Sequence, residues 1–210
     1  MRIGVISDTH VPVRARALPG EVFEIFAGVD LILHAGDLVT LDVLEELETI
    51  APVLAVHGNV DRVEVLARLP ATRQLEVWRN GLVKVDGKVW VEVGLQAEGQ
   101  NVIPVYDSHA GVVDVSESKT GKPIVIGLVH GHEGLGRTTP ERAARHFPDA
   151  DVVVFGHSHQ PMNEWRDDRL LFNPRSATDR RRAPRCSVGI LEVGETVRGE
   201  IIWLEDTKNL

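Results

Sequence analysis

The chain has little of several features that mark other classes of protein. It holds one cysteine, Cys186, in 210 residues, which excludes an intrachain disulfide, and no motif around it suggests a nucleophile. Aromatic residues make up 5% of the chain and the net charge is −8, so a basic and aromatic groove for nucleic acid is not expected. No apolar run approaches the length of a membrane span, and Met1-Arg2 leads straight into a strand-length apolar run. We therefore predict a cytoplasmic protein without a membrane or a stable nucleic-acid partner.

What the chain does have is enough apolar sequence for one core. Hydrophobic residues make up 43% of it, and 210 residues suit a single domain, residues 1–210. In the first part, strand-length apolar runs alternate with helical patterns at residues 21–27 and Leu41–Thr49, the second of which Thr40 can cap. This alternation predicts a parallel βαβ beginning.

Five short apolar runs each end in polar residues that bind metal ions well. Runs with β-branched residues are typical of buried strands, and the carboxyl ends of parallel strands meet at one edge of a sheet. Aspartate, asparagine and histidine suit Mg, Mn, Zn or Fe, and glycine lets the backbone turn sharply beside a bound ion. The residues that end the five runs therefore predict a metal site: Asp8-Thr9-His10, Gly36-Asp37, Gly58-Asn59-Val60-Asp61, His130-Gly131-His132 and Gly156-His157-Ser158-His159.

From Ala71 onward the pattern changes to strands that pair mostly antiparallel. Asp86-Gly87 predicts a hairpin turn, and residues 94–122, rich in glycine, serine and polar residues, are interpreted as an insertion. That insertion is a lid, an oligomer edge or a disordered loop. The expected strands are Gln74–Trp78, Leu82–Val85, Lys88–Val93, Met162–Trp165, Leu170–Phe172, Ser187–Val193 and Val197–Leu204.

Taken together, the five motifs resemble those of the calcineurin-like metallophosphoesterases, in the same order and from Met1 to about Ser176. The chain is most similar to the small prokaryotic phosphodiesterase-type branch, to which the retromer scaffold subunit is also related. The resemblance implies an α/β (α+β) fold, a two-sheet β-sandwich flanked by helices, with residues 139–147 forming one of the later helices. It also implies a metal-dependent phosphoesterase, more a diesterase than a monoesterase, that acts on a small phosphate ester.

The resemblance further implies two divalent ions, with Mn favoured and Mg, Fe, Ni, Zn or Co also suited. One ion would be held by Asp8, His10, Asp37 and His159, and the other by Asp37, Asn59, His130 and His157. Asp37 would bridge them, because a shared anion offsets the repulsion between cations roughly 3.5–4 Å apart. A metal-bridging hydroxide would then attack phosphorus.

Other residues receive roles beside the ions. We expect Asp61 to orient an imidazole or Asn59, and Asn59 also to contact substrate. Many family phosphatases have a histidine where this chain has Val60, so His132 or water would have to protonate the leaving group. His34 and His57 are either packed polar residues below the site or part of it, and His146 is expected to be structural or solvated.

One motif departs from the pattern of the branch. Asn173-Pro174-Arg175-Ser176 stands where Asn-Pro-Gly-Ser is common, and an arginine in left-handed backbone would cost about 1 kcal/mol or more. Arg175 either presents a guanidinium fork to phosphate or lies in a solvated basic loop. Further arginines follow it, at Arg180, Arg181, Arg182 and Arg185.

Two other functional interpretations are kept. One is a non-catalytic protein-interaction scaffold on the same fold, which the complete set of costly polar ligands argues against. The other is a nuclease, which the acidic charge and the missing aromatic-basic groove disfavour. The natural substrate, the metal and a homo-oligomeric state stay open.

Overall fold

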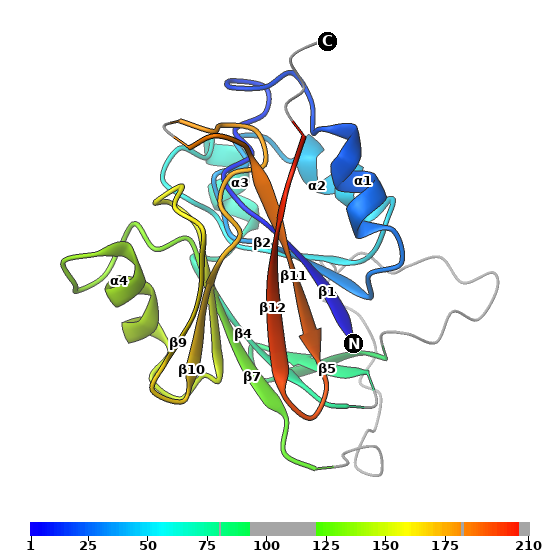
Figure 1. The fold of residues 1–210 in the computed structure, drawn as a ribbon, viewed down its shortest axis with the longest axis vertical. Helices are drawn as coiled ribbons and strands as arrows, with labels where there is room; N and C mark the ends of the chain where they lie inside the picture. The colour runs from blue at the N-terminus through cyan, green and yellow to red at the C-terminus, as the bar shows by residue number, and fades with distance from the viewer. Residues whose placement is uncertain (80, 93–120, 182, 206–210) are drawn as a thin grey trace.

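Two β-sheets pack face to face in the computed structural model, which describes residues 1–79, 81–92, 121–181 and 183–205 (Figure 1). The first sheet has the order β12-β11-β1-β2-β3 and the second the order β6-β5-β4-β7-β8-β10-β9. The strands of the first are β1 (Arg2–Ile6), β2 (Leu31–His34), β3 (Val53–Ala55), β11 (Ser187–Val193) and β12 (Val197–Trp203). Those of the second are β4 (Thr72–Val77), β5 (Leu82–Val85), β6 (Lys88–Glu92), β7 (Ile124–Val129), β8 (Val152–Phe155), β9 (Met162–Arg166) and β10 (Arg169–Asn173).

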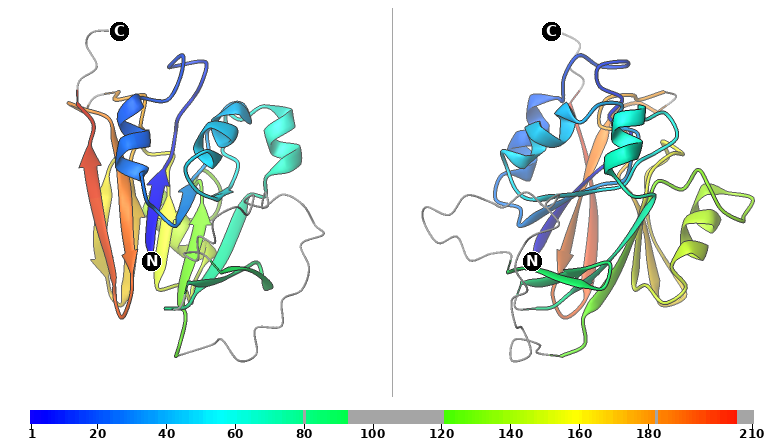
Figure 2. Two further views of the ribbon diagram at one scale, coloured as in Figure 1. Left: turned by 90° about the vertical axis from the view of Figure 1, so that its right-hand side faces the viewer. Right: turned by 180° about the vertical axis from the view of Figure 1, so that it is seen from behind.

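Helices cover the outer faces of both sheets. Helices α1 (Gly20–Phe26), α2 (Asp42–Glu48) and α3 (Val63–Arg68) pack on the first sheet, and α4 (Thr139–His146) packs on the second (Figure 2). The αββα sandwich predicted from the resemblance is therefore confirmed.

The alternation of side chains along β1 shows how the layers are held. Ile3 and Val5 are fully buried in the core between the sheets, and Ile6 faces the helices. Gly4 also faces the helices, where a Cβ would lie 3.1 Å from the ring of Phe26 in α1. Because glycine has no side chain, helix α1 can approach the sheet closely at this point.

Each sheet contains a run of parallel strands. In the first sheet β1, β2 and β3 are parallel, as the βαβ interpretation predicted. In the second sheet β7, β8 and β10 are parallel, although most strand pairs after Ala71 are antiparallel. An isolated bridge between Ser7 and Ser176 joins the ends of β1 and β10, so the carboxyl ends of the two parallel runs lie together, in the upper half of Figure 1.

The structure corrects some local predictions. Thr40 does not cap α2: the N-cap is Leu41, without a side-chain hydrogen bond, and the hydroxyl of Thr40 donates to the main-chain oxygen of Val11. Helix α3 was not predicted, because its six residues include one buried apolar side chain, Val65, which is too few for a periodic signal. Residues 94–120 of the predicted insertion lie outside the described residues.

Candidate metal centre

The site is assembled at the carboxyl ends of five strands from both sheets. The first sheet delivers Asp8 and His10 after β1, Asp37 after β2 and Asn59 after β3. The second sheet delivers His130 and His132 after β7, and His157 and His159 after β8. Main-chain hydrogen bonds fix these loops to one another, from Asp8 N to Gly36 O (3.0 Å), from His10 N to Asp37 O (3.0 Å) and from Gly156 N to His130 O (3.1 Å).

Many of these residues occupy left-handed backbone, which is unfavourable for residues other than glycine. A positive φ costs of order 1–2 kcal/mol, and such strain is concentrated at functional sites. This strain could not be predicted from the sequence, because none of these positions is a glycine. The strained candidate residues are Asp8 (φ 53°), His10 (47°), Asp37 (59°), His157 (64°) and His159 (52°).

A first compact group consists of Asp8, His10 and His159, which are all buried and have ligand atoms within 4.8 Å of one another. Nε2 of His159 lies 3.3 Å from Asp8 Oδ1 and 3.3 Å from Nε2 of His10. Nδ1 of His159 lies 3.2 Å from the main-chain oxygen of Asp179. Because a carbonyl only accepts, Nδ1 carries the proton and Nε2 faces the group with a free lone pair.

A second compact group consists of Asp8, Asp37 and His130. Nδ1 of His130 donates to the main-chain oxygen of Ala35 at 2.8 Å, which again leaves Nε2 to face the acids. That Nε2 atom is buried, lies 3.2 Å from Asp37 Oδ2, and has no hydrogen-bond partner among the described residues. A buried nitrogen directed at carboxylates in this way fits a metal ligand.

Asn59 and His157 complete the second group. Nδ1 of His157 lies 3.0 Å from Asn59 Oδ1, and the rings of His157 and His130 meet edge to face with centroids 5.2 Å apart. The structure thus brings all seven predicted metal ligands to one place. Asp8 belongs to both compact groups, whereas Asp37 belongs to the second and approaches the first through His10, 3.9 Å away.

The charge states of three candidate ligands, Asp8, His10 and His157, suit a cation. Burial acts to raise the pKa of Asp8, but contacts with His159 and His130 outweigh it and lower the pKa below its usual value. Burial and then the charge of His130 lower the pKa of His157 to about 4, and burial lowers the pKa of His10. Carboxylates that stay ionised and imidazoles that stay neutral are the forms that bind metal.

Asp61 accepts hydrogen bonds from main-chain groups of the ligand loops. Its Oδ2 accepts from the main-chain N–H groups of Gly58 (2.6 Å) and Asp37 (3.1 Å), and its Oδ1 accepts from Val39 N (2.6 Å). We expected Asp61 to orient an imidazole or Asn59, and its contacts in the structure are with main-chain donors of the loops that carry Asp37 and Asn59. Asp61 fixes the loops that carry Asp37 and Asn59.

The remaining histidines differ in their surroundings. His34 is fully buried, with Gly36 N donating to its Nδ1 and its Nε2 bonded to Thr9 Oγ1, so it is a packed polar residue below the site. His132 lies beside the second group, its ring 5.3 Å from that of His130, and burial lowers its pKa. His57 is partly buried, and the exposed His146 contacts the main-chain oxygen of Glu133, as a structural residue would.

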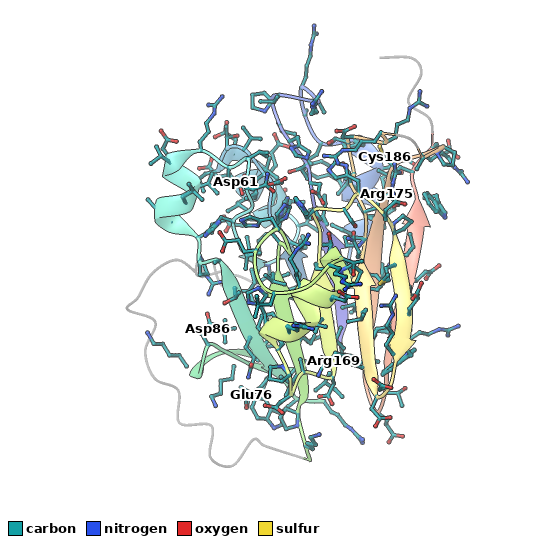
Figure 3. All side chains as sticks on the ribbon, turned by 90° about the vertical axis from the view of Figure 1, so that its left-hand side faces the viewer. Asp61, Glu76, Asp86, Arg169, Arg175 and Cys186 are labelled. Atoms are coloured by element: carbon teal, nitrogen blue, oxygen red, sulfur yellow. The ribbon has the colours of Figure 1, made fainter. Side chains whose placement is uncertain are left out.

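Arg175 is fully buried, so its interpretation as part of a solvated loop is wrong. Its φ of 71° confirms that an arginine stands where glycine would be favoured. Nε donates to the main-chain oxygen of His159 at 3.1 Å, and Nη2 donates to that of Arg180. These bonds occupy the Nε–Nη2 edge of the guanidinium, and Nη1 is buried without a hydrogen-bond partner among the described residues. Because the two bonds tie Arg175 to the main chain of His159 and Arg180, we assign it to positioning the His159 loop. Asp61 and Arg175 lie at the same end of the sheets (Figure 3).

Glycines leave room for the site without binding anything. A Cβ on Gly58 would collide with the Asp37 carboxylate, and one on Gly156 would collide with Ser7 Oγ and lie 2.7 Å from Asp8 Oδ2. The donor set as a whole contains nitrogen and oxygen atoms and no thiolate, which suits Mg or a first-row divalent ion. The residues present therefore fit a metal centre.

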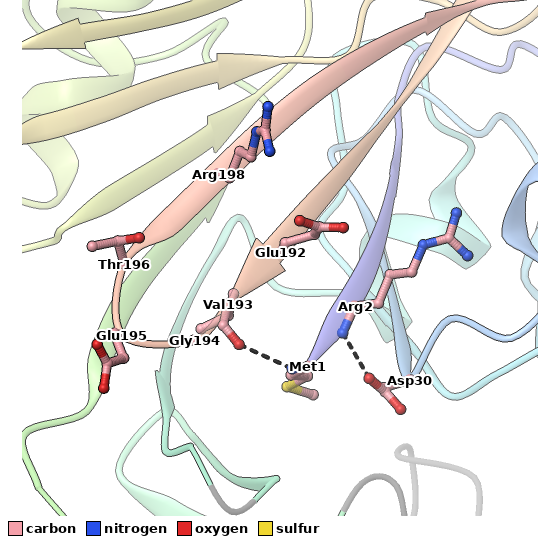
Figure 4. A pocket seen from close by; sticks show the side chains of 9 residues that line it. All are labelled: Met1, Arg2, Asp30, Glu192, Val193, Gly194, Glu195, Thr196 and Arg198. Atoms are coloured by element: carbon pink, nitrogen blue, oxygen red, sulfur yellow. Dashed lines mark hydrogen bonds between the residues drawn. The ribbon is translucent and has the colours of Figure 1, made fainter.

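A separate pocket of about 490 Å³ lies at the amino-terminal end of β1, away from these groups (Figure 4). Two main-chain donors in it already have partners: Arg2 N donates to Asp30 Oδ2 at 2.6 Å, and the Met1 amino group donates to Val193 O at 2.9 Å. Nothing in this pocket resembles the chemistry of the metal centre.

Comparisons with known proteins point to one family. The model of the calcineurin-like phosphoesterase superfamily domain matches residues 1–196. A probable metallophosphoesterase of Methanothermobacter thermautotrophicus is 35% identical over 207 residues, covering 96% of this chain and 92% of that protein. A phosphodiesterase of Methanocaldococcus jannaschii is 27% identical over 177 residues, covering 83% of this chain and 82% of that protein.

Solved structures share the fold. Vacuolar protein sorting 29 from Cryptosporidium parvum has a TM-score of 0.65 at 20% identity and covers 99% of this chain and 93% of its own. A structure described as a novel archaeal phosphodiesterase has a TM-score of 0.59 at 22% identity, covering 97% of this chain and 100% of its own. Within the described part of the chain, none of the helices has the length and apolar character that a membrane crossing needs.

Proposed function

Because the chain belongs to the calcineurin-like phosphoesterase superfamily, we propose that it is a dinuclear metal-dependent phosphodiesterase. The observation that carries this proposal is the pair of compact buried groups, Asp8–His10–His159 and Asp8–Asp37–His130, that share a carboxylate. Two such groups side by side can hold two cations, and a carboxylate between them offsets their repulsion. Asp8 is common to both groups, and for Asp37, which lies in the second group and 3.9 Å from His10 of the first, we propose the bridging role expected from the sequence.

The residues divide into ligands and supporting groups. When bound, two divalent ions polarise a phosphoryl oxygen and lower the pKa of water toward neutrality. The Nδ1–H groups of His130 and His159 donate to main-chain carbonyls. These bonds hold the two rings so that Nε2 of each faces the ligand groups. We assign the two ions to Asp8, His10, Asp37, Asn59, His130, His157 and His159, with Mn as the favoured metal.

Asn59 and His132 are proposed to act on the substrate. Asn59 sits with His157 beside the second group, where an amide can also donate to a phosphate oxygen. His132 lies in the same region and is the candidate for protonating the leaving group, since Val60 occupies the position of the histidine that many family phosphatases use. The archaeal relative is named a phosphodiesterase, which favours diesters.

The proposal is tested on the purified protein after exhaustive chelation and add-back of Mn, Mg, Ni or Zn. Hydrolysis of bis(nitrophenyl) phosphate is measured beside nitrophenyl phosphate. We expect no turnover after chelation, recovery with at least one transition metal, and faster turnover of the diester. Full activity without metal would refute the metal-dependent mechanism, and a faster monoester would refute the diesterase assignment.

The alternative is a non-catalytic protein-interaction scaffold, to which the structural similarity to vacuolar protein sorting 29 points. That similarity is at 20% identity and reflects the fold. A scaffold has no need to keep seven polar ligands together, five of them in strained backbone. Absence of turnover in protein shown to hold metal would favour the scaffold.

A further inference from the structure

The loop that leads from β7 to helix α4 is held by side chains of that helix. Nε of Arg142 donates to the main-chain oxygen of Gly131 at 3.0 Å, and Nε2 of His146 lies 3.3 Å from that of Glu133. These two carbonyls belong to the residues on either side of His132. Helix α4 therefore fixes the backbone from which the His132 side chain projects.

The contact between α4 and Gly131 is close as well as polar. A Cβ on Gly131 would lie 2.9 Å from Cγ2 of Thr139, in the first turn of the helix, and Gly131 has a φ of 91°. Nη2 of Arg142 donates to Oγ1 of the same Thr139 at 3.0 Å. The guanidinium is thus held at two points, and its planar fork fixes the direction in which Nε reaches the loop.

Helix α4 is itself firmly fixed to the second sheet. Ala143 of the helix and Phe147 just after it pack into an apolar cluster that includes Val129 at the end of β7. At the N-terminus of the helix the Thr138 side chain accepts from Glu141 N, and the Glu141 side chain accepts from Thr138 N, which completes a capping box. Arg142 therefore reaches the loop from a helix whose position is set by its own contacts.

The two histidines of this loop differ in how their rings are held. Nδ1 of His130 donates to Ala35 O at 2.8 Å, and Gly156 N donates to His130 O at 3.1 Å. Nδ1 of His132 is buried and, in the described part of the chain, has no hydrogen-bond partner, while its Nε2 lies 3.4 Å from the exposed carboxylate of Glu133. The position of His132 therefore depends on its backbone, whereas His130 is fixed by contacts with other strand ends.

We propose that Arg142 is a positioning residue of the reaction, which places His132 beside the metal centre without contributing to metal binding. The inference rests on the proposed function, because it assigns to Arg142 the placement of the group that is proposed to protonate the leaving group. A displacement of about 1 Å at a reacting group can cost about 10²-fold in rate. Loss of the Arg142 bond should therefore lower kcat for esters that need a proton donor.

The test uses two variants of Arg142 that differ in one hydrogen bond. Arg142→Gln keeps a donor nitrogen the same number of bonds from the main chain as Nε, and Arg142→Met keeps the length of the side chain without a donor. The substrates, tested on Mn-loaded protein, are thymidylyl-thymidine, whose leaving group is an alkoxide, and bis(nitrophenyl) phosphate. For the dinucleotide we expect kcat to fall about 10²-fold in Arg142→Met, with KM unchanged, and to stay within about threefold in Arg142→Gln. The nitrophenyl diester should be hydrolysed at nearly the unaltered rate by both variants.

Further measurements distinguish this role from general support of the fold. Calorimetric titration should give the same Mn stoichiometry and affinity in Arg142→Met as in the unaltered protein. Arg145→Ala removes an exposed arginine from the same helix and should keep both rates. Adding His132→Ala to Arg142→Met should slow the dinucleotide no further than His132→Ala alone, because the two residues act as a unit. Equal slowing of both substrates, weaker Mn binding or additive effects of the two substitutions would overturn the proposal.

Two other cases still give a decision. If Arg142→Met does not fold, Thr139→Val, which removes the acceptor of Nη2, takes its place, and an unchanged kcat for the dinucleotide would then overturn the proposal. If no ester is hydrolysed, the proposed function fails, and the NMR signals of the histidine rings in chelated protein decide, with the His132 signal identified by its loss in His132→Ala. A shift of that signal in Arg142→Met, with the other ring signals in place, supports the placement of His132 by Arg142. An unmoved His132 signal would overturn it.

Discussion

Nε2 of His130 lies 3.2 Å from Oδ2 of Asp37, and these two residues come from different sheets of the sandwich. Burial acts to lower the pKa of His130, but the contact with Asp37 and the charges of Asp8 and Asp37 raise it overall. The same contact helps to lower the pKa of Asp37 against the effect of burial. The metal centre is thus built on the junction between the sheets, and its geometry depends on how they pack.

A first prediction concerns His34 and acid. Burial lowers the pKa of His34 to about 3 from 6.5, so below pH 6.5 the unfolded chain takes up a proton that the folded chain does not. The stability from this residue is full above pH 6.5 and is lost as the pH falls toward 3. Between pH 7 and pH 5 we expect about 2 kcal/mol less stability from this group alone. Urea unfolding of chelated protein and of His34→Asn at both pH values measures it, and an equal loss in both proteins would contradict the assignment.

Gly58 gives a second prediction. In Gly58→Ala the new Cβ would collide with the Asp37 carboxylate, so we expect weaker Mn binding and a loss of about 1–3 kcal/mol in the free energy of unfolding. Gly20→Ala is the matched control, because no atom lies within 4 Å of its new Cβ. Calorimetric Mn binding and denaturant unfolding provide the readouts. Unchanged Mn affinity in Gly58→Ala would show that the loop tolerates the shift.

Arg175 gives a third prediction, which separates the effect of its side-chain bonds from the effect of its backbone conformation. Arg175→Ala and Arg175→Gly both remove the bonds to His159 and Arg180, and both should weaken Mn binding. Because φ is 71°, the glycine variant should be about 1 kcal/mol more stable than the alanine variant. Metal titration and unfolding of the two variants measure these effects. Equal stabilities, or Mn affinities like that of the unaltered protein, would argue against the positioning role.

His132 gives a fourth prediction, which concerns the leaving group. A positioned general acid is typically worth about 10²–10⁴-fold, and only poor leaving groups need it. His132→Ala should therefore slow an alkyl diester by about 10²-fold or more and leave a nitrophenyl diester nearly unchanged. Both substrates are measured on the same variant, because a loss of metal would slow the hydrolysis of both. If both slow equally, His132 positions metal or substrate instead.

Much of the site could be predicted because the end of a buried strand can be recognised in the sequence, where a short apolar run gives way to glycine and polar residues. Short runs such as Val152–Phe155, followed at once by Gly156 and two histidines, place ligands at a sheet edge by geometry alone. Helix α3 was not predicted, because a single buried residue, Val65, cannot produce a helical repeat of apolar residues. The main-chain donors to Asp61 could not be predicted, because they come from loops whose approach only the folded chain defines.

Arg175 shows the other limit of sequence reasoning. Its type and its basic neighbours suggested a solvated or phosphate-binding loop, yet the side chain is fully buried on two carbonyls. Burial of a single arginine depends on which long-range carbonyls reach it, and residues 159 and 175 are brought together by β8 and β10 pairing. The residues next to Arg175 in the sequence therefore do not predict its contact with His159.

The most direct test of the two-ion centre is a titration of the chelated protein with Mn, followed by hydrolysis of bis(nitrophenyl) phosphate at each step. The two groups that share Asp8 predict that activity rises until two equivalents of Mn are bound and then stays constant. Activity that is complete at one equivalent, or that is present before any Mn is added, would contradict a dinuclear centre.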